Sequence, residues 1–324
     1  MSGMLFLILY ILIFPGFLFL LAYALFLEYI DRRIAARMQS RVGPPWYQPL
    51  ADFVKMLAKE VIDPAGIDRR IFDAAPLVAL AAVMTAFIYV PVIGASPLAF
   101  EGDLVLVLYL LTIPTIILFL LGWLSRNVYA VMGGIRAVTQ FFIYEVPFFL
   151  VLLTPGLMAG SWSISVIAAW QQQHVWCALL QPIGFIVALV TLQAKLERPP
   201  FDIPEAETEI VAGPWTELTG RRLAIMHLAM DTTLVTGAGL VAVVFLGGPL
   251  LPWAIEPAWL SGLSGFVLFL VKTLGILLIL SAIRAATGRI RIDQLNEIGW
   301  KYITGAALFQ VAIVLVMQSV LVVL

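Results

Sequence analysis

The stretch Glu197-Arg-Pro-Pro-Phe-Asp-Ile-Pro-Glu-Ala-Glu-Thr-Glu-Ile-Val-Ala-Gly-Pro-Trp-Thr-Glu-Leu-Thr-Gly220 is the part of the chain around which the rest is organised. It holds six carboxylates and one base, and it lies between two apolar segments that are each long enough to cross a bilayer. Five apolar residues stand among its acids: Phe201, Ile203, Ile210, Val211 and Trp215. A solvated linker has no need of them, so we expect this loop, residues 195–222, to fold back against membrane helices.

The same loop is a candidate proton site. Its prolines at 199, 200 and 204 prevent one continuous helix, although Pro204 suits the first turn of a new one. From there Glu205 and Glu209 are expected to share a helix face, with Glu207 pointing away. Carboxylates that are partly buried and crowded by like charge have raised pKa values and exchange protons near neutral pH. An ordinary acidic surface loop is the alternative interpretation.

The composition identifies an integral membrane protein. Hydrophobic residues make up 62% of the chain and charged residues 12%, and the mean hydropathy is +1.02, far outside the range of soluble domains. Nothing in it suggests a nucleic-acid partner. The chain has one cysteine, Cys177, and two histidines, which cannot form a structural zinc site or hold an iron–sulfur cluster. We therefore expect no metal site here and place any redox cofactors in partner subunits.

Eight apolar runs have the length of a membrane span. They are 4–27, 74–95, 104–124, 137–159, 175–194, 223–247, 260–283 and 302–323. The predicted fold is a single all-α membrane domain, residues 1–324, with about eight transmembrane helices. Eighteen of the 19 basic residues lie in alternate loops, and the opposite loops hold none. By the positive-inside rule the acidic loop faces the cytoplasm, and both termini lie on the outer side of the cytoplasmic membrane.

Residues 46–62, between the first two spans, form an additional predicted helix. Apolar side chains recur there at helical spacing, while charged side chains fall largely between them. The pattern predicts an amphipathic helix in the cytoplasmic interface. A helix buried against a partner subunit is an equally good interpretation. Both interpretations hold if one face of the helix meets the membrane interface and the other meets a partner.

Three ionisable residues fall inside predicted spans, where charge is costly and commonly functional. They are Glu145, Asp231 and Lys272. For Glu145 and Asp231 the alternative is a structural polar contact within the bundle. For Lys272 such a contact is the favoured interpretation, and a counter-ion for one of the acids is the alternative. His227 is expected to pack between helices rather than to join a proton route. These features together indicate an ion-conducting membrane subunit. A secondary transporter fits them too, but would predict two related halves.

Several motifs in order along the chain resemble the H subunit of NADH:quinone oxidoreductase, the respiratory complex I family, and the homologous membrane subunit of energy-converting [NiFe] hydrogenases and formate hydrogenlyase. The motifs are Asp31-Arg32-Arg33, Arg41-Val42-Gly43-Pro44, Gln48-Pro49-Leu50-Ala51-Asp52, Gly134-Ile135-Arg136-Ala137, Tyr144-Glu145-Val146, Pro200-Phe201-Asp202-Ile203-Pro204-Glu205-Ala206-Glu207-Thr208-Glu209 and Asp293-Gln294-Leu295. The resemblance covers nearly the whole chain.

The resemblance implies a role and a set of residues. In that family this membrane protein joins a hydrophilic redox arm, with an iron–sulfur subunit and a large catalytic subunit, to small membrane subunits and antiporter-like subunits. Residues that resemble the start of the proton path are Glu145, Glu205, Glu207, Glu209, Glu217 and Asp231. Residues that resemble the lining of the redox-arm or quinone cavity are Arg32, Arg41, Asp52, Arg136 and Asp202. The chain is then no catalyst by itself. Iron–sulfur clusters, together with a [NiFe] site in hydrogenase-type members, belong to its partners.

Three departures from the family pattern bear on the electron acceptor. The segment after Gly43-Pro44 is short, Lys195 stands where the family has an acid, and Glu197 and Asp231 are displaced from the expected positions. The short segment resembles the hydrogenase-type members. We therefore favour a hydrogenase-like complex, with the quinone-binding H subunit as the alternative.

Overall fold

The computed structural model describes residues 2–250 and 257–323, and every regular element within these ranges is helical. The main helices are α2 (Phe17–Met38), α3 (Gln48–Ala58), α4 (Arg69–Tyr89), α5 (Asp103–Leu110), α6 (Ile113–Leu124), α7 (Val128–Ala159), α10 (Pro182–Lys195), α12 (Gly220–Leu246), α13 (Ala258–Ala286) and α15 (Thr304–Val323). Shorter elements are α1 (Ser2–Leu12), α8 (Ile164–Gln173), α9 (Cys177–Leu180), α11 (Glu207–Ile210), a 3-10 turn (Gly213–Glu217), α14 (Ile292–Glu297) and a π-helical turn (Ile298–Ile303). The all-α membrane fold predicted from the sequence is confirmed.

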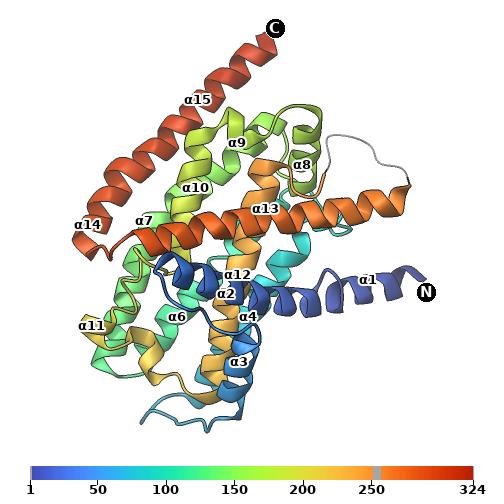
Figure 1. The fold of residues 1–324 in the computed structure, drawn as a ribbon. Helices are drawn as coiled ribbons and strands as arrows, with labels where there is room; N and C mark the ends of the chain where they lie inside the picture. Colours follow the sequence, from blue (N-terminus) through green and yellow to red (C-terminus); the bar gives the residue numbers. More distant parts are fainter. Residues whose placement is uncertain (1, 251–256, 324) are drawn as a thin grey trace.

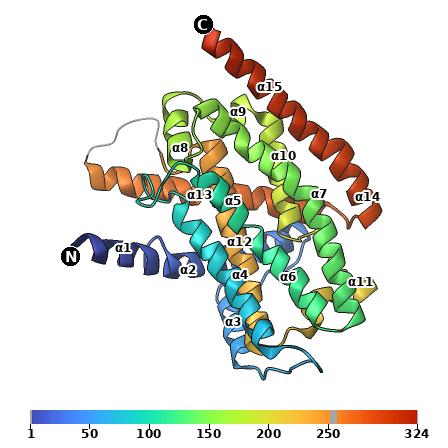
Figure 2. The same cartoon turned by 180° about the vertical axis from the view of Figure 1, so that it is seen from behind.

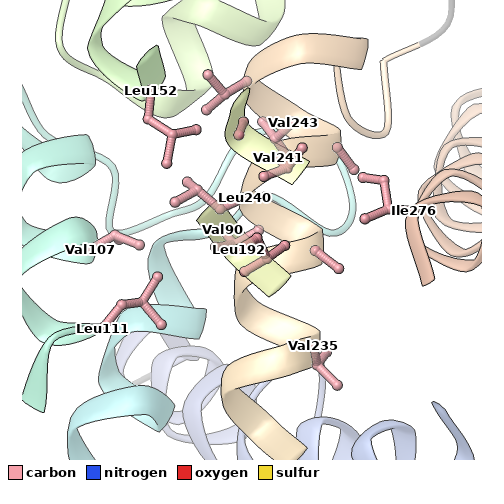
Figure 3. Packing of buried hydrophobic residues seen from close by; sticks show 14 of the residues in the cluster. Val90, Val107, Leu111, Leu152, Leu192, Val235, Leu240, Val241, Val243 and Ile276 are labelled. Carbon is pink, nitrogen blue, oxygen red and sulfur yellow. The ribbon is translucent and has the colours of Figure 1, made fainter. Parts of the chain in front are cut away.

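Helix α12 is the centre of the bundle, and every residue from Thr232 to Phe245 is buried. Small residues allow this. A side chain added at Gly237 would lie 2.5 Å from Leu192 of α10, so the two helices approach closely only because this position is glycine. The hydroxyls of Thr232, Thr233 and Thr236 donate back to carbonyls of α12 itself, which satisfies them without water. Figure 3 shows the aliphatic side chains packed around its upper half.

The other long helices surround α12. Helices α2, α4, α10 and α13 pack directly against it, and α7 packs against α6, α10 and α15. Figure 1 shows α13 crossing α12 steeply rather than running beside it. Seen from behind in Figure 2, α15 lies along the outer side of α7 and α10. Both α1 and α15 present exposed apolar side chains to the surroundings, as expected where a chain meets lipid or another subunit.

Seven helical segments are long and apolar enough to cross a membrane, counted over the described residues. The remaining predicted span, 175–194, is interrupted. It consists of α9 and the 14-residue α10, separated at Gln181 before Pro182. Because an α-helix rises 1.5 Å per residue, α10 is about 21 Å long, shorter than the ~30 Å hydrocarbon core. Proline cannot continue the hydrogen-bonding of the preceding turn, which accounts for the break.

One predicted span starts later than the real helix. Helix α7 begins at Val128 rather than at residue 137, because the side chain of Asn127 caps it and accepts a hydrogen bond from the backbone N–H of Tyr129 at 2.9 Å. The predicted helix beginning at Pro204 is reduced to the four residues of α11. Ala206, just before it, has a φ of 25°, which ends any helix coming from Pro204.

Helix α3 lies in the predicted interfacial segment and packs against α2 and α12. Leu50, Val54 and Leu57 follow one another at i, i+4 and i+7 and form an exposed apolar stripe. The connection that follows α3 is tied to the start of α12. The Thr219 hydroxyl exchanges hydrogen bonds with the backbone of Ile62 at 2.9 and 3.1 Å. Arg222, almost fully buried, forms ion pairs with Asp63 and Asp73 at 2.6 and 2.7 Å.

The sidedness predicted from the basic residues can be tested with single cysteines. Because Cys177 is buried, the parent chain should give little background labelling. A membrane-impermeant maleimide should label Gln173→Cys in intact cells, but should label Glu297→Cys only after permeabilisation. Labelling of Glu297→Cys from outside would contradict the predicted orientation.

Candidate functional site

The acidic loop is packed against the bundle. Phe201, Ile203, Ile210 and Trp215 are buried, whereas Val211 is exposed, so four of the five apolar residues of the loop face inward. The loop backbone rests directly on α7. A side chain at Gly133 of α7 would lie 2.6 Å from the Cα of Gly213 and 2.9 Å from the carbonyl oxygen of Pro204. Glycine at position 133 therefore lets the loop touch the helix.

Arg198 anchors the beginning of the loop to α2. Its guanidinium donates hydrogen bonds to Glu28 and to Asp31, both at 2.9 Å. Asp31, which is fully buried, also accepts hydrogen bonds from Arg284 at 2.6 Å and from the hydroxyl of Ser281 at 2.5 Å, both on α13. A single carboxylate thus holds the loop and two helices together. No sequence pattern indicates this cluster, because its members are far apart in the chain.

Arg32 extends the cluster to α3. It donates to Glu28 at 2.6 Å and to Asp52 at 3.1 Å. Asp52 accepts further hydrogen bonds from Lys55 and Gln48. Partial burial of Asp52 opposes ionisation, but the hydrogen bonds from Lys55, Gln48 and Arg32 outweigh it and hold the pKa of this carboxyl below its ordinary value. Asp52 is therefore a permanent anion near neutral pH.

A cavity of about 280 Å³ lies among α2, α3 and α12. It is lined by Leu25, Glu28, Arg32, Pro49, Asp52, Phe53, Lys55, Met56, His227, Leu228 and Asp231. The cavity brings together Arg32 and Asp52, both predicted to line it, with Asp231, which was assigned to the proton path. His227 stacks on Trp215 of the acidic loop, with ring centroids 4.6 Å apart, so the loop forms part of the wall behind the cavity.

An apolar cavity of about 300 Å³ adjoins the first. It is lined by Ala22, Leu25, Phe26, Trp46, Tyr47 and Leu50, and it shares Leu25 with the polar cavity. The rings of Trp46 and Tyr47 meet edge to face and are both exposed. The short segment after Pro44 therefore places two aromatic side chains at the mouth of this apolar space.

Glu145 forms a buried ion pair with Lys195. The Lys195 ammonium lies 2.9 and 2.7 Å from the two carboxylate oxygens, and it lies over the rings of Tyr144 and Phe148, 5.3 Å from each centroid. Lys195 is 1% exposed. Removing either partner would leave a buried charge unpaired, which is far more costly than removing both. Lys195 was noted in the sequence as a departure, but its pairing with Glu145 was not predicted.

Three further predicted acids of the loop, Glu209, Asp202 and Glu217, each have a partner on another segment. Glu209 pairs with Arg136 at 2.6 Å, and this hydrogen bond lowers the pKa of Glu209 against the small effect of burial. The raised pKa expected for the loop acids is therefore wrong for Glu209. Asp202 lies 3.5 Å from Arg289, and Glu217 accepts a hydrogen bond from Asn127 at 2.5 Å.

Two predicted positions stand apart from the cavity between α2, α3 and α12. Arg136 lines a separate small cavity of about 180 Å³ together with Arg289, Arg291 and Asp293. Arg41 is exposed beyond the end of α2. Glu205 is half-buried within the loop, and Glu207 is the first residue of α11.

Lys272 of α13 has a structural role. Its ammonium donates hydrogen bonds to the carbonyl oxygens of Leu246 and Gly248 at 2.6 and 2.8 Å, and it lies over the ring of Trp176. It therefore caps the C-terminal end of α12, where the helix leaves carbonyls unpaired and a cation is favourable. The structural polar contact that we favoured for Lys272 is confirmed, and the alternative of a counter-ion for an intramembrane acid is wrong.

The structure is a multi-pass helical bundle with a polar cavity, a buried ion pair and an acidic loop packed against it. These features define a membrane protein with ionisable groups inside its bundle. A family model described as NADH dehydrogenase matches residues 9–315. The chain belongs to this family.

Relatives of the chain match it over most of its length. It is 37% identical over 306 residues to the H subunit of NADH-quinone oxidoreductase from Carboxydothermus hydrogenoformans, covering 91% of this chain and 85% of that protein. It is 36% identical over 316 residues to the second H subunit of NADH-quinone oxidoreductase from Geobacter sulfurreducens, covering 92% of each. Among solved structures, a chain of the membrane-bound sulfane sulfur reductase, an archaeal respiratory membrane complex, matches with a TM-score of 0.82 and 27% identity over 92% of this chain and 96% of that one.

The Asp31 cluster should be a main source of stability. We expect Asp31→Asn to destabilise the chain by ~3 kcal/mol or more, because Arg198 and Arg284 would lose their shared buried carboxylate. The measurement is thermal or denaturant unfolding of the purified complex. Glu297→Gln removes an exposed pair with Lys301 and should cost less than ~1 kcal/mol. Equal effects of the two variants would contradict a stabilising role for the cluster.

Proposed function

We propose that this chain is the membrane subunit that links a hydrophilic redox arm to an ion-translocating membrane arm in a complex I-like respiratory complex, and that it starts the proton path. The observation that carries the proposal is the position of the acidic loop. Through Arg198 and Trp215 it contacts both the charged cluster on α2 and the wall of the polar cavity. A change of charge in a partner bound at this end acts on both at once.

The coupling is electrostatic. Carboxylates that are held by cations in a buried site change protonation when those cations are drawn elsewhere, and one pKa unit corresponds to ~1.4 kcal/mol. In the proposed path Asp231 faces the cavity, Glu205, Glu207, Glu209 and Glu217 belong to the loop, and Glu145 lies within α7. Opening of the Glu145–Lys195 pair would free one carboxylate inside the bundle to accept a proton.

The favoured complex is of the energy-converting hydrogenase type. The short segment from Pro45 to Tyr47 supports this choice, as does the likeness to the sulfane sulfur reductase complex. The partners proposed for the chain are an iron–sulfur subunit and a large catalytic subunit on the cytoplasmic side. Small membrane subunits and antiporter-like subunits would lie beside it in the cytoplasmic membrane, with both termini of this chain outside.

A quinone-reducing complex is the second candidate, and one observation favours it. The apolar cavity at Trp46 and the polar cavity at Asp52 meet at Leu25. An apolar space leading to a charged one is the arrangement that a lipid-soluble quinone headgroup requires. The curated relatives are named as NADH-quinone oxidoreductase subunits, which supports the same candidate.

Variants of the buried pair test the proton path. We expect Glu145→Gln to reduce coupled ion transport by the purified complex in proteoliposomes while electron transfer continues, because the variant cannot exchange a proton. The same loss is expected for Glu207→Gln. The double variant Glu145→Gln/Lys195→Met removes both buried charges, so it should be at least as stable as the single variant and should still lack coupled transport. Transport at the parental rate in the double variant would show that the pair is structural.

A bulky residue at the junction of the two cavities tests the acceptor. For a hydrogenase-type complex we expect Leu25→Trp to leave electron transfer unchanged, with no turnover linked to added quinone. The control is Leu9→Trp, on an exposed part of α1. Quinone-dependent turnover that Leu25→Trp abolishes and Leu9→Trp retains would establish the quinone candidate instead.

A further inference from the structure

Glu197 is a buried carboxyl without a partner. It is 5% exposed, and neither of its carboxylate oxygens has a hydrogen-bond partner in the part of the chain that the structure describes. It follows the C-terminal end of α10, between Lys195 and Arg198. Buried carboxylates are normally paired or hydrogen-bonded, so an isolated one needs an explanation.

Both neighbouring cations are engaged elsewhere. Lys195 is held by Glu145, and Arg198 is held by Glu28 and Asp31. The like charge of Glu205 acts on Glu197 from the loop. Burial first, and then Glu205, raise the pKa of Glu197 to about 8. The site therefore favours the neutral carboxylic acid at ordinary cytoplasmic pH.

The backbone at Glu197 is also unusual. Its φ of 53° lies in the left-handed region, which a residue other than glycine adopts at a cost of ~1 kcal/mol. Its N–H donates to the carbonyl oxygen of Ala194 at 3.1 Å, and the same oxygen accepts a hydrogen bond from the side chain of Gln140 at 2.7 Å. Glycine would hold this turn with less strain, so the conformation gives no reason for a carboxyl here.

Two glutamines that donate hydrogen bonds to the backbone on either side of Glu197 also have acceptors without donors. The side-chain amide oxygens of Gln140 and Gln193 are buried and have no hydrogen-bond donor among the described residues. The same is true of the two carboxylate oxygens of Glu197. A neutral carboxylic acid has an O–H to donate, and water supplies donors as well. A proton on Glu197 therefore suits its surroundings better than a negative charge does.

Glu197 is joined to both sides through its neighbours in the chain: Lys195, two residues before it, binds Glu145 of α7, and Arg198, directly after it, anchors the acidic loop to α2. Glu205 acts on it from the loop, and both Glu197 and Glu145 act electrostatically on Tyr144 of α7. The Tyr144 hydroxyl is hydrogen-bonded to Thr115 at 3.1 Å. The charged and titratable groups near Glu197 are thus Arg198 and Glu205 on the loop side, and Tyr144 and the Glu145–Lys195 pair on the side of α7.

We propose that Glu197 is a proton-exchanging residue that relays protons between Glu205 in the acidic loop and Glu145 in α7. The proton leaves the Glu197 carboxyl for water and reaches the Glu145 carboxylate when the pair with Lys195 opens, and Glu197 is then reprotonated from the loop side. No other reactant is needed. The inference rests on the proposed function and adds a residue that the family resemblance does not assign to the path.

Infrared difference spectroscopy on the purified complex tests the protonation directly. The parent complex should show a carboxylic-acid C=O band that disappears as the pH rises through about 8. Glu197→Gln should lose this band, Glu197→Asp should retain a shifted one, and Glu297→Gln should leave it unchanged. A band that persists in Glu197→Gln, or that is absent from the parent, would overturn the assignment.

Stability gives a second readout that does not depend on transport. Because the pKa is raised on folding, the folded chain binds more protons than the unfolded one between the ordinary value of 4.5 and about 8. The contribution of Glu197 to stability is therefore greatest below this window and falls as the pH rises through it. The thermal midpoint of Glu197→Gln should lack this fall, and an unchanged pH profile would count against the proposal.

Transport separates a relay from an isolated acid. We expect Glu197→Gln to lose coupled ion transport and Glu197→Asp to retain part of it. A band that is lost in Glu197→Gln while transport stays at the parental level would overturn the relay. Because the band reports the protonation of Glu197 alone, it remains informative even if Glu145→Gln transports normally and the proposed proton path fails.

Discussion

The guanidinium of Arg198 is the contact on which the rest of the arrangement depends. It bridges Glu28 and Asp31 of α2, and Asp31 in turn holds Arg284 of α13. The acidic loop, the first long helix and the penultimate long helix therefore meet at one buried point. This anchor sets where the acidic loop begins. The loop then reaches the wall of the polar cavity, where Trp215 stacks on His227, and it packs on α7 at Gly133.

Near this point the carboxyl groups differ in how their charge is balanced. Glu28, Asp31 and Asp52 each accept a hydrogen bond from an arginine. Glu145 has one cation, and Glu197 has none in the part of the chain that the structure describes. In the proposed proton path these two carboxyl groups are therefore the ones best placed to exchange a proton, because fewer cations hold them in the charged form.

The sequence predicted the membrane fold and the packing of the acidic loop, since both depend on local features. Hydropathy marked α12, and the apolar residues among the loop acids marked its contact with the bundle. It missed what depends on distant partners. Arg136 lowers the pKa of Glu209 from 73 residues away, and Lys272 caps α12 through the backbone carbonyls of Leu246 and Gly248, which carry no sequence signal. The interruption before Pro182 was visible in the sequence, but the hydropathy of the surrounding run outweighed it.

The central helix α12 is synthesised after the helices that pack around it from the first half of the chain. Ribosomes add roughly 5–20 residues per second, and Arg198 is separated from Glu28 by 170 residues, so Glu28 has only Arg32 beside it for roughly 10–30 s before Arg198 is made. During that time the early helices reach the bilayer without the helix that later separates and supports them. The contacts that join α2 to the acidic loop and to α13 can therefore form only late in translation, after Arg198 and Arg284 have been made.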